Sequence, residues 1–295
     1  MILQYHSGAL TAKLDASRKV LVSCVRFDLS QGESLALIGE TGSGKTMIAL
    51  SVMGLLPGNV SCVGSDIRFL GSPIPNDRSL LGTQIVYIPQ NGLEFLNPSK
   101  KVRHHLYDSL RRLGIPRQQW ETVAAQKLVQ AGFASPEAVL DKYPFQLSGG
   151  MAQRVTIAIS TCSHAKLVIA DEPTNGLDHQ AREQFMNMLH SLFPEAAKLI
   201  ITHDIGIAAL CSKALVLCGG KTMELGDAGN LLHSPRHPYT KALMGALVEN
   251  GMQETPVLRS GTHDCPFYRR CPQAAGGCTR CRHSEDGIEW WCSEG

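Results

Sequence analysis

The chain has 295 residues, of which 43% are hydrophobic and 18% are charged, and its formal net charge is +2. This composition predicts a globular protein with a large core, built as one large domain with or without an appendage. The small charge, with no basic run that carries interleaved aromatic residues, gives little support to a nucleic-acid partner. The apolar stretches are interrupted well short of a membrane span and the N-terminus has no signal-peptide pattern, so we expect a cytosolic protein.

Strand-like and helix-like segments alternate along the chain. Residues 35–39 are typical of a short buried strand that enters a glycine-rich loop, and residues 46–56 of the helix after it, ended by Pro57 and Gly58. Further β-branched runs of strand length are residues 84–89, 166–172, 198–204 and 214–220. Helical spacing of apolar residues marks residues 99–114, 120–132 and 148–162. This order predicts an α/β fold with a mainly parallel sheet, covered by helices, and an inserted helical block.

The glycine-rich loop reads GETGSGKT at residues 39–46 and fits the pattern GxxxxGK[ST] between a strand and a helix. The glycines let backbone N–H groups turn toward phosphate oxygens, and the helix N-terminus adds partial positive charge. We expect the Lys45 ammonium to bridge the β- and γ-phosphates and the Thr46 hydroxyl to bind Mg²⁺. The predicted ATP-binding residues are Gly39, Glu40, Thr41, Gly42, Ser43, Gly44, Lys45 and Thr46.

Two further segments narrow the class of enzyme. The strand at residues 167–172, LVIADE, ends with two carboxylates, of which Asp171 is expected to bind Mg²⁺ and Glu172 to polarise the water that attacks the γ-phosphate. Residues 147–154, LSGGMAQR, place a serine and two glycines at the start of a second helix, which has no phosphate of its own to bind. Two such helix ends in one chain suggest that two chains face each other.

Taken in order, these motifs resemble those of ABC transporter ATP-binding subunits, and the resemblance covers nearly the whole chain. It rests on the loop at 39–46, Gln90 in YIPQ, the signature at 147–154, LVIADE at 167–172, Asp178 at the end of NGLD, and His203 in IITHD. The resemblance implies a P-loop NTPase core of the ABC type with an inserted helical subdomain at roughly residues 92–160. One departure is the lack of an aromatic residue upstream of the loop, where Lys13 or Leu14 would cover adenine instead.

The same resemblance implies a role for each motif. ATP would lie between the phosphate-binding loop of one subunit and the signature of the other in a head-to-tail dimer. The residues that face the partner's ATP would be Ser148, Gly149, Gly150 and Gln153, and Asp178 would form the D-loop. Glu172, His203 and Gln90 would be the catalytic residues, with His203 contacting the γ-phosphate. Thr46, Gln90 and Asp171 would be the Mg²⁺ ligands.

The C-terminal part resembles the extension of peptide and nickel importer subunits, through residues 233–247 and the stretch CPFYRRC. We therefore divide the chain into an ATPase domain at 1–232 and an extension at 233–295. The segments YPFQLSGGMAQR and IPQNGLEFLNP most resemble the nickel or metallophore branch, and the missing aromatic residue points the same way. The family implies a homologous second ATPase, two transmembrane permease subunits and an extracytoplasmic solute-binding protein as partners, and a peripheral place on the cytoplasmic face of the membrane.

Five cysteines follow residue 264: Cys265, Cys271, Cys278, Cys281 and Cys292. Because a reducing compartment disfavours disulfides, this group points to a metal. Four thiolates suit either Zn²⁺ or an iron–sulfur centre, and only Cys278 and Cys281 form the C-x₂-C step of a zinc knuckle. Since the resembling importer subunits include members with a cluster, we expect [4Fe–4S] on Cys265, Cys271, Cys278 and Cys292, with Cys281 as a substitute for one of the last two. The alternatives are Zn²⁺ and free thiols.

Two other classes of protein are alternatives to an importer subunit. One is an ABC ATPase that acts on nucleic acid or ribosomes; DNA-repair members carry a long coiled coil between loop and signature, and here that segment shows no heptads. The other is a metal-handling protein with a secondary ATPase, supported only by the cysteines and the 11 histidines.

Overall fold

The computed structural model describes residues 1–14, 17–75, 78–174, 179–247, 250–259, 263–274 and 280–292, without the side chain of residue 179. The chain forms two compact units. We call residues 1–74 and 200–295 the terminal unit, because it contains both ends of the chain, and residues 75–199 the central unit.

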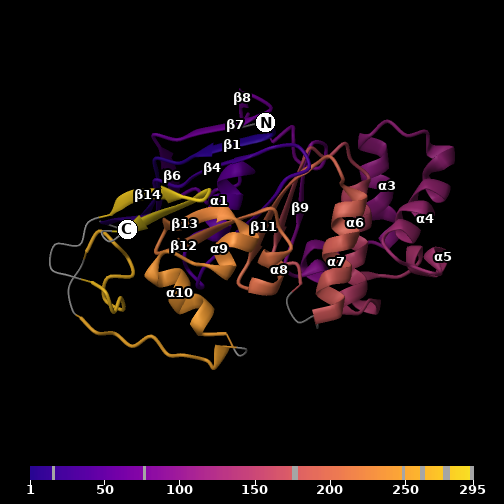
Figure 1. The fold of residues 1–295 in the computed structure, drawn as a ribbon. Helices are drawn as coiled ribbons and strands as arrows, with labels where there is room; N and C mark the ends of the chain where they lie inside the picture. The colour runs from indigo at the N-terminus through magenta and orange to yellow at the C-terminus, as the bar shows by residue number, and fades with distance from the viewer. Residues whose placement is uncertain are drawn as a thin grey trace. The chain divides into compact units, whose positions relative to one another are not determined.

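The terminal unit contains mainly short strands (Figure 1). Its strands are β1 (Leu3–His6), β2 (Ala9–Leu14), β3 (Ser17–Ser23), β4 (Arg26–Leu29), β5 (Ser34–Ile38), β6 (Val60–Val63), β7 (Asp66–Phe69), β8 (Ser72–Pro73), β12 (Lys213–Cys218), β13 (Lys221–Asp227), β14 (Cys281–Glu285) and β15 (Ile288–Cys292). Its helices are α1 (Lys45–Val52), α8 (Ile205–Ala209), α9 (Ala228–His233) and α10 (Pro238–Gly245). Strand β11 (Ala197–Thr202) crosses the boundary between the units.

The strand that enters the glycine loop is fully buried, as predicted. Every residue of β5 is buried, and β5 pairs in parallel with β12, Leu37 lying opposite Leu215. A nearly continuous apolar run of this kind is typical of a strand covered on both faces. The helix after the loop is shorter than predicted and ends at Val52, because Gly54 adopts a left-handed φ of 65° and closes a Schellman turn.

The N-terminal strands form two antiparallel groups that the sequence did not reveal. Their orders are β4-β1-β7-β8 and β3-β2-β6. In β1 the residues alternate between buried and half-buried, with Leu3 opposite Leu29 on β4. Strands of only four residues carry too few alternations to stand out from a loop.

The C-terminal extension continues the sheet that contains β5 and β12. Strand β13 pairs antiparallel with β12, and β15 pairs with β13 so that Trp290 lies opposite Glu224. Figure 1 shows the C-terminal strands in yellow, with β14 labelled. The Glu224 side chain is fully buried, and its carboxylate accepts hydrogen bonds from the backbone N–H groups of Arg236 (2.8 Å) and His237 (3.1 Å). Because β15 adds a strand to β13, the extension is part of the sheet and not a loose tail.

The central unit combines two parallel strands with a group of helices. Its strands are β9 (Ile85–Ile88) and β10 (Leu167–Asp171). Its helices are α2 (Gly92–Phe95), α3 (Val102–Arg112), α4 (Trp120–Gln130), α5 (Pro136–Leu140), α6 (Gly149–Thr161) and α7 (His179–Leu192), with single turns at Arg117–Gln119 and Pro144–Gln146. Val168 on β10 lies opposite Val86 on β9. These parallel pairs confirm the predicted α/β fold with a mainly parallel sheet.

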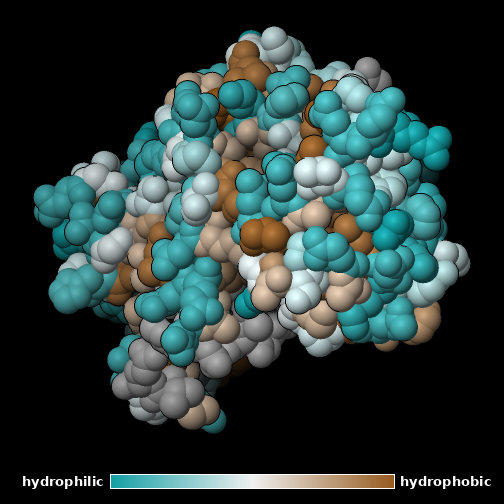
Figure 2. Space-filling view, turned by 90° about the vertical axis from the view of Figure 1, so that its right-hand side faces the viewer, coloured by the Kyte–Doolittle hydropathy of each residue, from teal (hydrophilic) through white to brown (hydrophobic). Residues whose placement is uncertain are grey.

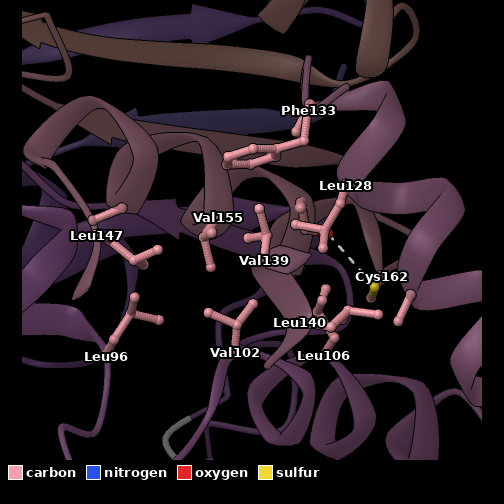
Figure 3. Close-up of a cluster of buried hydrophobic side chains, with 14 of the residues drawn as sticks. Leu96, Val102, Leu106, Leu128, Phe133, Val139, Leu140, Leu147, Val155 and Cys162 are labelled. Atoms are coloured by element: carbon pink, nitrogen blue, oxygen red, sulfur yellow. Dashed lines mark hydrogen bonds between the residues drawn. The ribbon is translucent and has the colours of Figure 1, made fainter. Parts of the chain in front are cut away.

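The helices α3 to α6 share one apolar core. Figure 3 shows Leu106, Leu128, Val139 and Val155 from four different helices pointing into this cluster, each at most 5% exposed. The face shown in Figure 2 is mostly hydrophilic, with hydrophobic residues in small separate patches. The periodic apolar residues of these helices therefore serve packing among themselves.

We expect Leu128→Ala to destabilise the protein by about 2–5 kcal/mol, because truncation of a fully buried leucine leaves a cavity in this core. The matched control is Val129→Ala on the same helix, since Val129 is 55% exposed and its loss should change stability by less than about 0.5 kcal/mol. Urea denaturation followed by circular dichroism measures both. Equal midpoints for the two variants would show that the cluster does not stabilise the fold.

Candidate nucleotide-binding site

The phosphate-binding loop connects β5 to α1 in the terminal unit, and close contacts require glycine at two of its positions, Gly39 and Gly44. A Cβ atom at Gly39 would lie 2.2 Å from the carbonyl oxygen of Leu217. Gly44 has a φ of 100°, and a Cβ there would lie 2.7 Å from Val22 Cγ2. Any larger residue would force the loop away from the sheet.

Donor groups converge in this loop in a way that suits an anion. Lys45 is only 8% exposed, and its Nζ donates to the carbonyl oxygens of Gly39 (2.6 Å) and Glu40 (3.2 Å). The Ser43 hydroxyl is buried and has no hydrogen-bond partner among the described residues. An ammonium and an unsatisfied hydroxyl at a helix N-terminus fit a phosphate group. Thr46, the predicted Mg²⁺ ligand of the loop, is exposed at the first turn of α1.

Contacts from the C-terminal extension to the loop were missed by the sequence reasoning. The Arg270 guanidinium donates to both carboxylate oxygens of Glu40, at 2.8 and 2.9 Å. The backbone N–H of Glu40 donates to the hydroxyl of Tyr239 at 3.2 Å. No sequence signal marks a contact between residues 230 positions apart.

His203 also belongs to the terminal unit and directly follows β11. Its side chain is exposed. The next residue, Asp204, caps α8 by accepting hydrogen bonds from the backbone N–H groups of Gly206 (2.9 Å) and Ile207 (3.4 Å). A strand on one side and a capped helix on the other fix the backbone at His203.

The two carboxylates of the central unit differ in their surroundings. Asp171 is 8% exposed at the end of β10, and its Oδ2 accepts a hydrogen bond from the hydroxyl of Tyr87 at 3.3 Å. Burial, together with this nearby carboxylate, raises the pKa of Tyr87 well above its ordinary value. Glu172 adopts a left-handed φ of 45°, a strained conformation for a residue with a side chain. Such strain is concentrated at functional sites.

The signature residues lie at the N-terminus of α6, where Ser148 caps the helix by accepting a hydrogen bond from the backbone N–H of Met151 (3.3 Å). No described atom lies within 4 Å of a Cβ added to Gly149 or Gly150. Gln153 is buried, and its Nε2 donates to the carbonyl oxygen of Pro89 at 3.1 Å. Gly149, Gly150, Gln153 and the exposed Gln90 line one cavity of about 490 Å³ within the central unit.

The predicted site residues are thus divided between the units. The terminal unit contains the phosphate-binding loop and His203, and the central unit contains Gln90, Asp171, Glu172 and the signature. Asp178 lies outside the described residues.

Four cysteines of the extension lie in the described residues. Cys265 and Cys271 are buried, at 8% and 7% exposure. Cys281 and Cys292 lie opposite each other on the β14–β15 hairpin. Cys278 lies outside the described residues, and among those described no group of three or more His, Cys, Asp or Glu side chains is placed to bind a metal ion.

The strand, glycine loop and helix with a buried lysine, together with a carboxylate pair at the end of a parallel strand, define a P-loop nucleotide hydrolase. Comparison with known proteins is more specific. Residues 22–175 match the ABC transporter family, and residues 223–278 match the C-terminal region of oligopeptide and dipeptide transporters.

Individual relatives agree with these matches. The chain is 34% identical to the dipeptide transport ATP-binding protein DppD of Escherichia coli (strain K12), over 97% of this chain and 90% of the relative. It is 36% identical to the oligopeptide transport ATP-binding protein OppD of Salmonella typhimurium, over 87% and 82%. The solved structure of cbiO1 from Clostridium perfringens superimposes with a TM-score of 0.66 at 22% identity, over 83% and 94%.

The chain therefore belongs to the ABC transporter family, as an ATP-hydrolysing, ATP-binding subunit. This confirms the family and the enzyme class expected from the motifs. None of the helices in the described ranges has the length and apolar character needed to cross a membrane.

Proposed function

We propose that the chain powers a peptide importer as one of two head-to-tail ATPase subunits, with ATP bound between the phosphate-binding loop of one subunit and the signature of the other. The observation that carries this proposal is the presence of two different glycine-flanked helix N-termini, those of α1 and α6. Lys45 at the first can neutralise phosphate charge. The second offers backbone N–H groups and open glycines to a ligand that arrives from another chain.

Within this arrangement each site residue has a defined role, and Gln90 has two. Gly39 to Thr46 bind the phosphates, and bound Mg²⁺ would neutralise charge on them with Thr46, Gln90 and Asp171 as its ligands. Glu172 polarises the attacking water, Gln90 orients it, and His203 donates to the γ-phosphate. Ser148, Gly149, Gly150 and Gln153 face the partner's ATP, and Asp178 is the last residue of the D-loop sequence NGLD.

The solute class follows from the relatives and the extension. DppD and OppD, by their names, serve dipeptide and oligopeptide transport, and the C-terminal match is to the same kind of transporter. Short peptides are therefore the proposed solute. Nickel or a metal chelate, which the sequence resemblance suggested, is the second candidate, and measurement of solute uptake decides between them.

The proposed assembly contains this chain, a homologous second ATPase, two transmembrane permeases and an extracytoplasmic solute-binding protein, with no nucleic acid. The chain would lie peripherally on the cytoplasmic face of the membrane. We propose residues 1–232 as the ATPase domain, with its helical subdomain at roughly 92–160, and 233–295 as the extension.

Affinity purification of the full chain from detergent-solubilised membranes tests this assembly. Permeases and a second ATPase should co-purify, and the complex should hydrolyse ATP faster than the isolated chain, because each ATP needs a signature from another subunit. Vesicles containing the complex should then take up a labelled dipeptide and not Ni²⁺. Co-purifying ribosomes or nucleic acid would support the rival class of ABC ATPases that act on them. A fully active monomer would contradict the shared ATP site. Uptake of Ni²⁺ alone would show that the solute is nickel and not a peptide.

We also propose that the extension binds a [4Fe–4S] cluster through Cys265, Cys271, Cys278 and Cys292. Support comes from the burial of Cys265 and Cys271 and from the hairpin that brings Cys281 beside Cys292, so that either can be the last ligand. Thiolates of this number suit iron–sulfur clusters and Zn²⁺ alike. The cluster would be structural, since the sequence of residues 271–278, CPQAAGGC, has few apolar side chains from which a core could form.

Anaerobically purified protein is expected to be brown, with absorbance at about 400 nm and about four iron atoms per chain. Cys271→Ser should lower the iron content, whereas Cys62→Ser, at an exposed position far from the tail in sequence, should not. Colourless protein with about one zinc per chain would exclude the cluster and support the Zn²⁺ alternative.

A further inference from the structure

The first residues of the phosphate-binding loop are contacted by side chains from the C-terminal extension. Glu40 receives two parallel hydrogen bonds from the Arg270 guanidinium, at 2.8 and 2.9 Å, and its backbone N–H donates to the Tyr239 hydroxyl at 3.2 Å. Bidentate pairs of this kind fix orientation as well as distance. Both the side chain and the backbone of Glu40 are thus oriented by residues more than 190 positions away.

These two extension side chains are themselves held by packing. Tyr239 is 1% exposed in the first turn of α10, and its ring meets the ring of Phe267 edge-on, with centroids 5.3 Å apart. Phe267 is also 1% exposed, and the Arg270 guanidinium carbon lies 5.3 Å from the centre of its ring. Stacking on an aromatic face restricts the guanidinium and prepares it for the carboxylate.

A second route joins the same segment to the loop. The turn between β12 and β13 touches the loop, because the backbone N–H of Gly220 donates to the carbonyl oxygen of Ser43 at 3.0 Å. Pro266 packs on this turn so closely that a Cβ at Gly219 would lie 2.7 Å from it. Lys221 at the start of β13 pairs with Asp264. Residues 264–270 therefore contact the loop directly at Glu40 and indirectly at Ser43.

The Lys45 ammonium makes a third contact with Glu40, because it donates to the Glu40 carbonyl oxygen. This oxygen and a bound phosphate compete for the same ammonium. Nζ donates to the carbonyl oxygens of Gly39 and Glu40, and a bound phosphate offers the same ammonium a stronger, charged acceptor. As the ammonium is drawn toward phosphate, the start of the loop depends more on its outer contacts with Arg270 and Tyr239.

We propose that Arg270 is a positioning residue for nucleotide binding. It acts through Glu40 and keeps the start of the phosphate-binding loop in its binding conformation. Nucleotide affinity therefore depends on the order of the cysteine-rich extension. The proposal rests on the assignment of residues 39–46 to ATP. The ion pair is partly exposed, at 28% for Arg270 and 48% for Glu40, so its effect is moderate.

Nucleotide affinity of the full chain tests the proposal, measured by calorimetric titration with ATP and Mg²⁺. Arg270→Ala should raise the Kd about three- to tenfold. Arg270→Lys keeps the charge without the planar fork and should fall between Arg270→Ala and the wild type. The matched control is Arg269→Ala, the exposed neighbour whose Nε donates to the carbonyl oxygen of Arg259 and which should bind ATP as the wild type does.

A double-mutant cycle separates positioning from general destabilisation. Once Glu40→Gln has removed the carboxylate, adding Arg270→Ala should change the Kd less than about twofold, because the interaction is already lost. By reciprocity, ATP should slow amide hydrogen exchange in residues 265–271 of the wild type, and do so less in Arg270→Ala.

Three results would overturn the proposal: a Kd for Arg270→Ala equal to that of Arg269→Ala, additive effects of Arg270→Ala and Glu40→Gln, or amide exchange in residues 265–271 that ATP leaves unchanged. Lys45→Ala separates this failure from failure of the ATP-site assignment. If Lys45→Ala weakens binding and Arg270→Ala does not, the loop binds ATP without help from the extension. If Lys45→Ala leaves binding unchanged, the assignment of the loop itself is wrong.

Discussion

Glu172→Gln is expected to lower ATP turnover by the assembled transporter at least about 100-fold while leaving ATP binding intact. The amide keeps the size of the side chain and its strained position after β10, with φ at 45°, but removes the charge that polarises the attacking water. Loss of a positioned base accounts for this magnitude. His203→Ala should have a similar effect on turnover, since it removes a donor to the γ-phosphate and leaves the phosphate-binding loop untouched.

The control for this experiment is Glu195→Gln, which makes the same chemical change at an exposed position where the carboxylate lies 3.9 Å from Lys166. Steady-state hydrolysis gives kcat, and binding of a fluorescent ATP analogue gives the affinity of each variant. Near-normal kcat in Glu172→Gln would remove this residue from its proposed role.

Lys45→Ala should act one step earlier and weaken nucleotide binding itself. Hydrogen bonds to charged groups contribute about 1.5–3 kcal/mol, so loss of the ammonium corresponds to a rise in Kd of roughly 10- to 150-fold. Calorimetric titration with ATP measures it.

Two measurements make the Lys45 result specific. Lys166→Ala, the loss of a half-exposed lysine of the central unit, should leave the Kd unchanged. Thermal unfolding of Lys45→Ala checks that the loop has not unfolded, because Nζ also bridges two backbone carbonyl oxygens. Wild-type affinity in a folded Lys45→Ala variant would move the nucleotide site elsewhere.

Local sequence patterns predicted the elements that position the nucleotide residues. The runs at β5 and β10 are each recognisable from their own residues. All five residues of each strand are buried, and a strand that is buried on both faces has a mostly apolar sequence. The start of helix α6 could also be predicted from the sequence, since Ser148 and the glycines after it are typical of a helix N-terminus. Its bounds differ from the expected ones by a single residue at each end.

Contacts with no local cause could not be predicted from the sequence. The pairing of Arg270 with Glu40 joins residues 230 positions apart, and no spacing rule connects them. The hydrogen bond from Tyr87 to Asp171 similarly depends on the adjacency of β9 and β10. Short strands such as β1 and β8 are defined by their neighbours in the sheet and not by their own residues.

The buried carboxylate of Glu224 ties the ATPase core to the C-terminal extension. This residue belongs to β13, yet the N–H groups that satisfy its charge come from residues 236 and 237, and the strand beside it is β15. A chain shortened to residue 232 would retain all six nucleotide motifs but would have an uncovered strand edge and a carboxylate without donors. We expect such a fragment to associate edge to edge. An exchange of extensions between related subunits would therefore have to carry β13 with it.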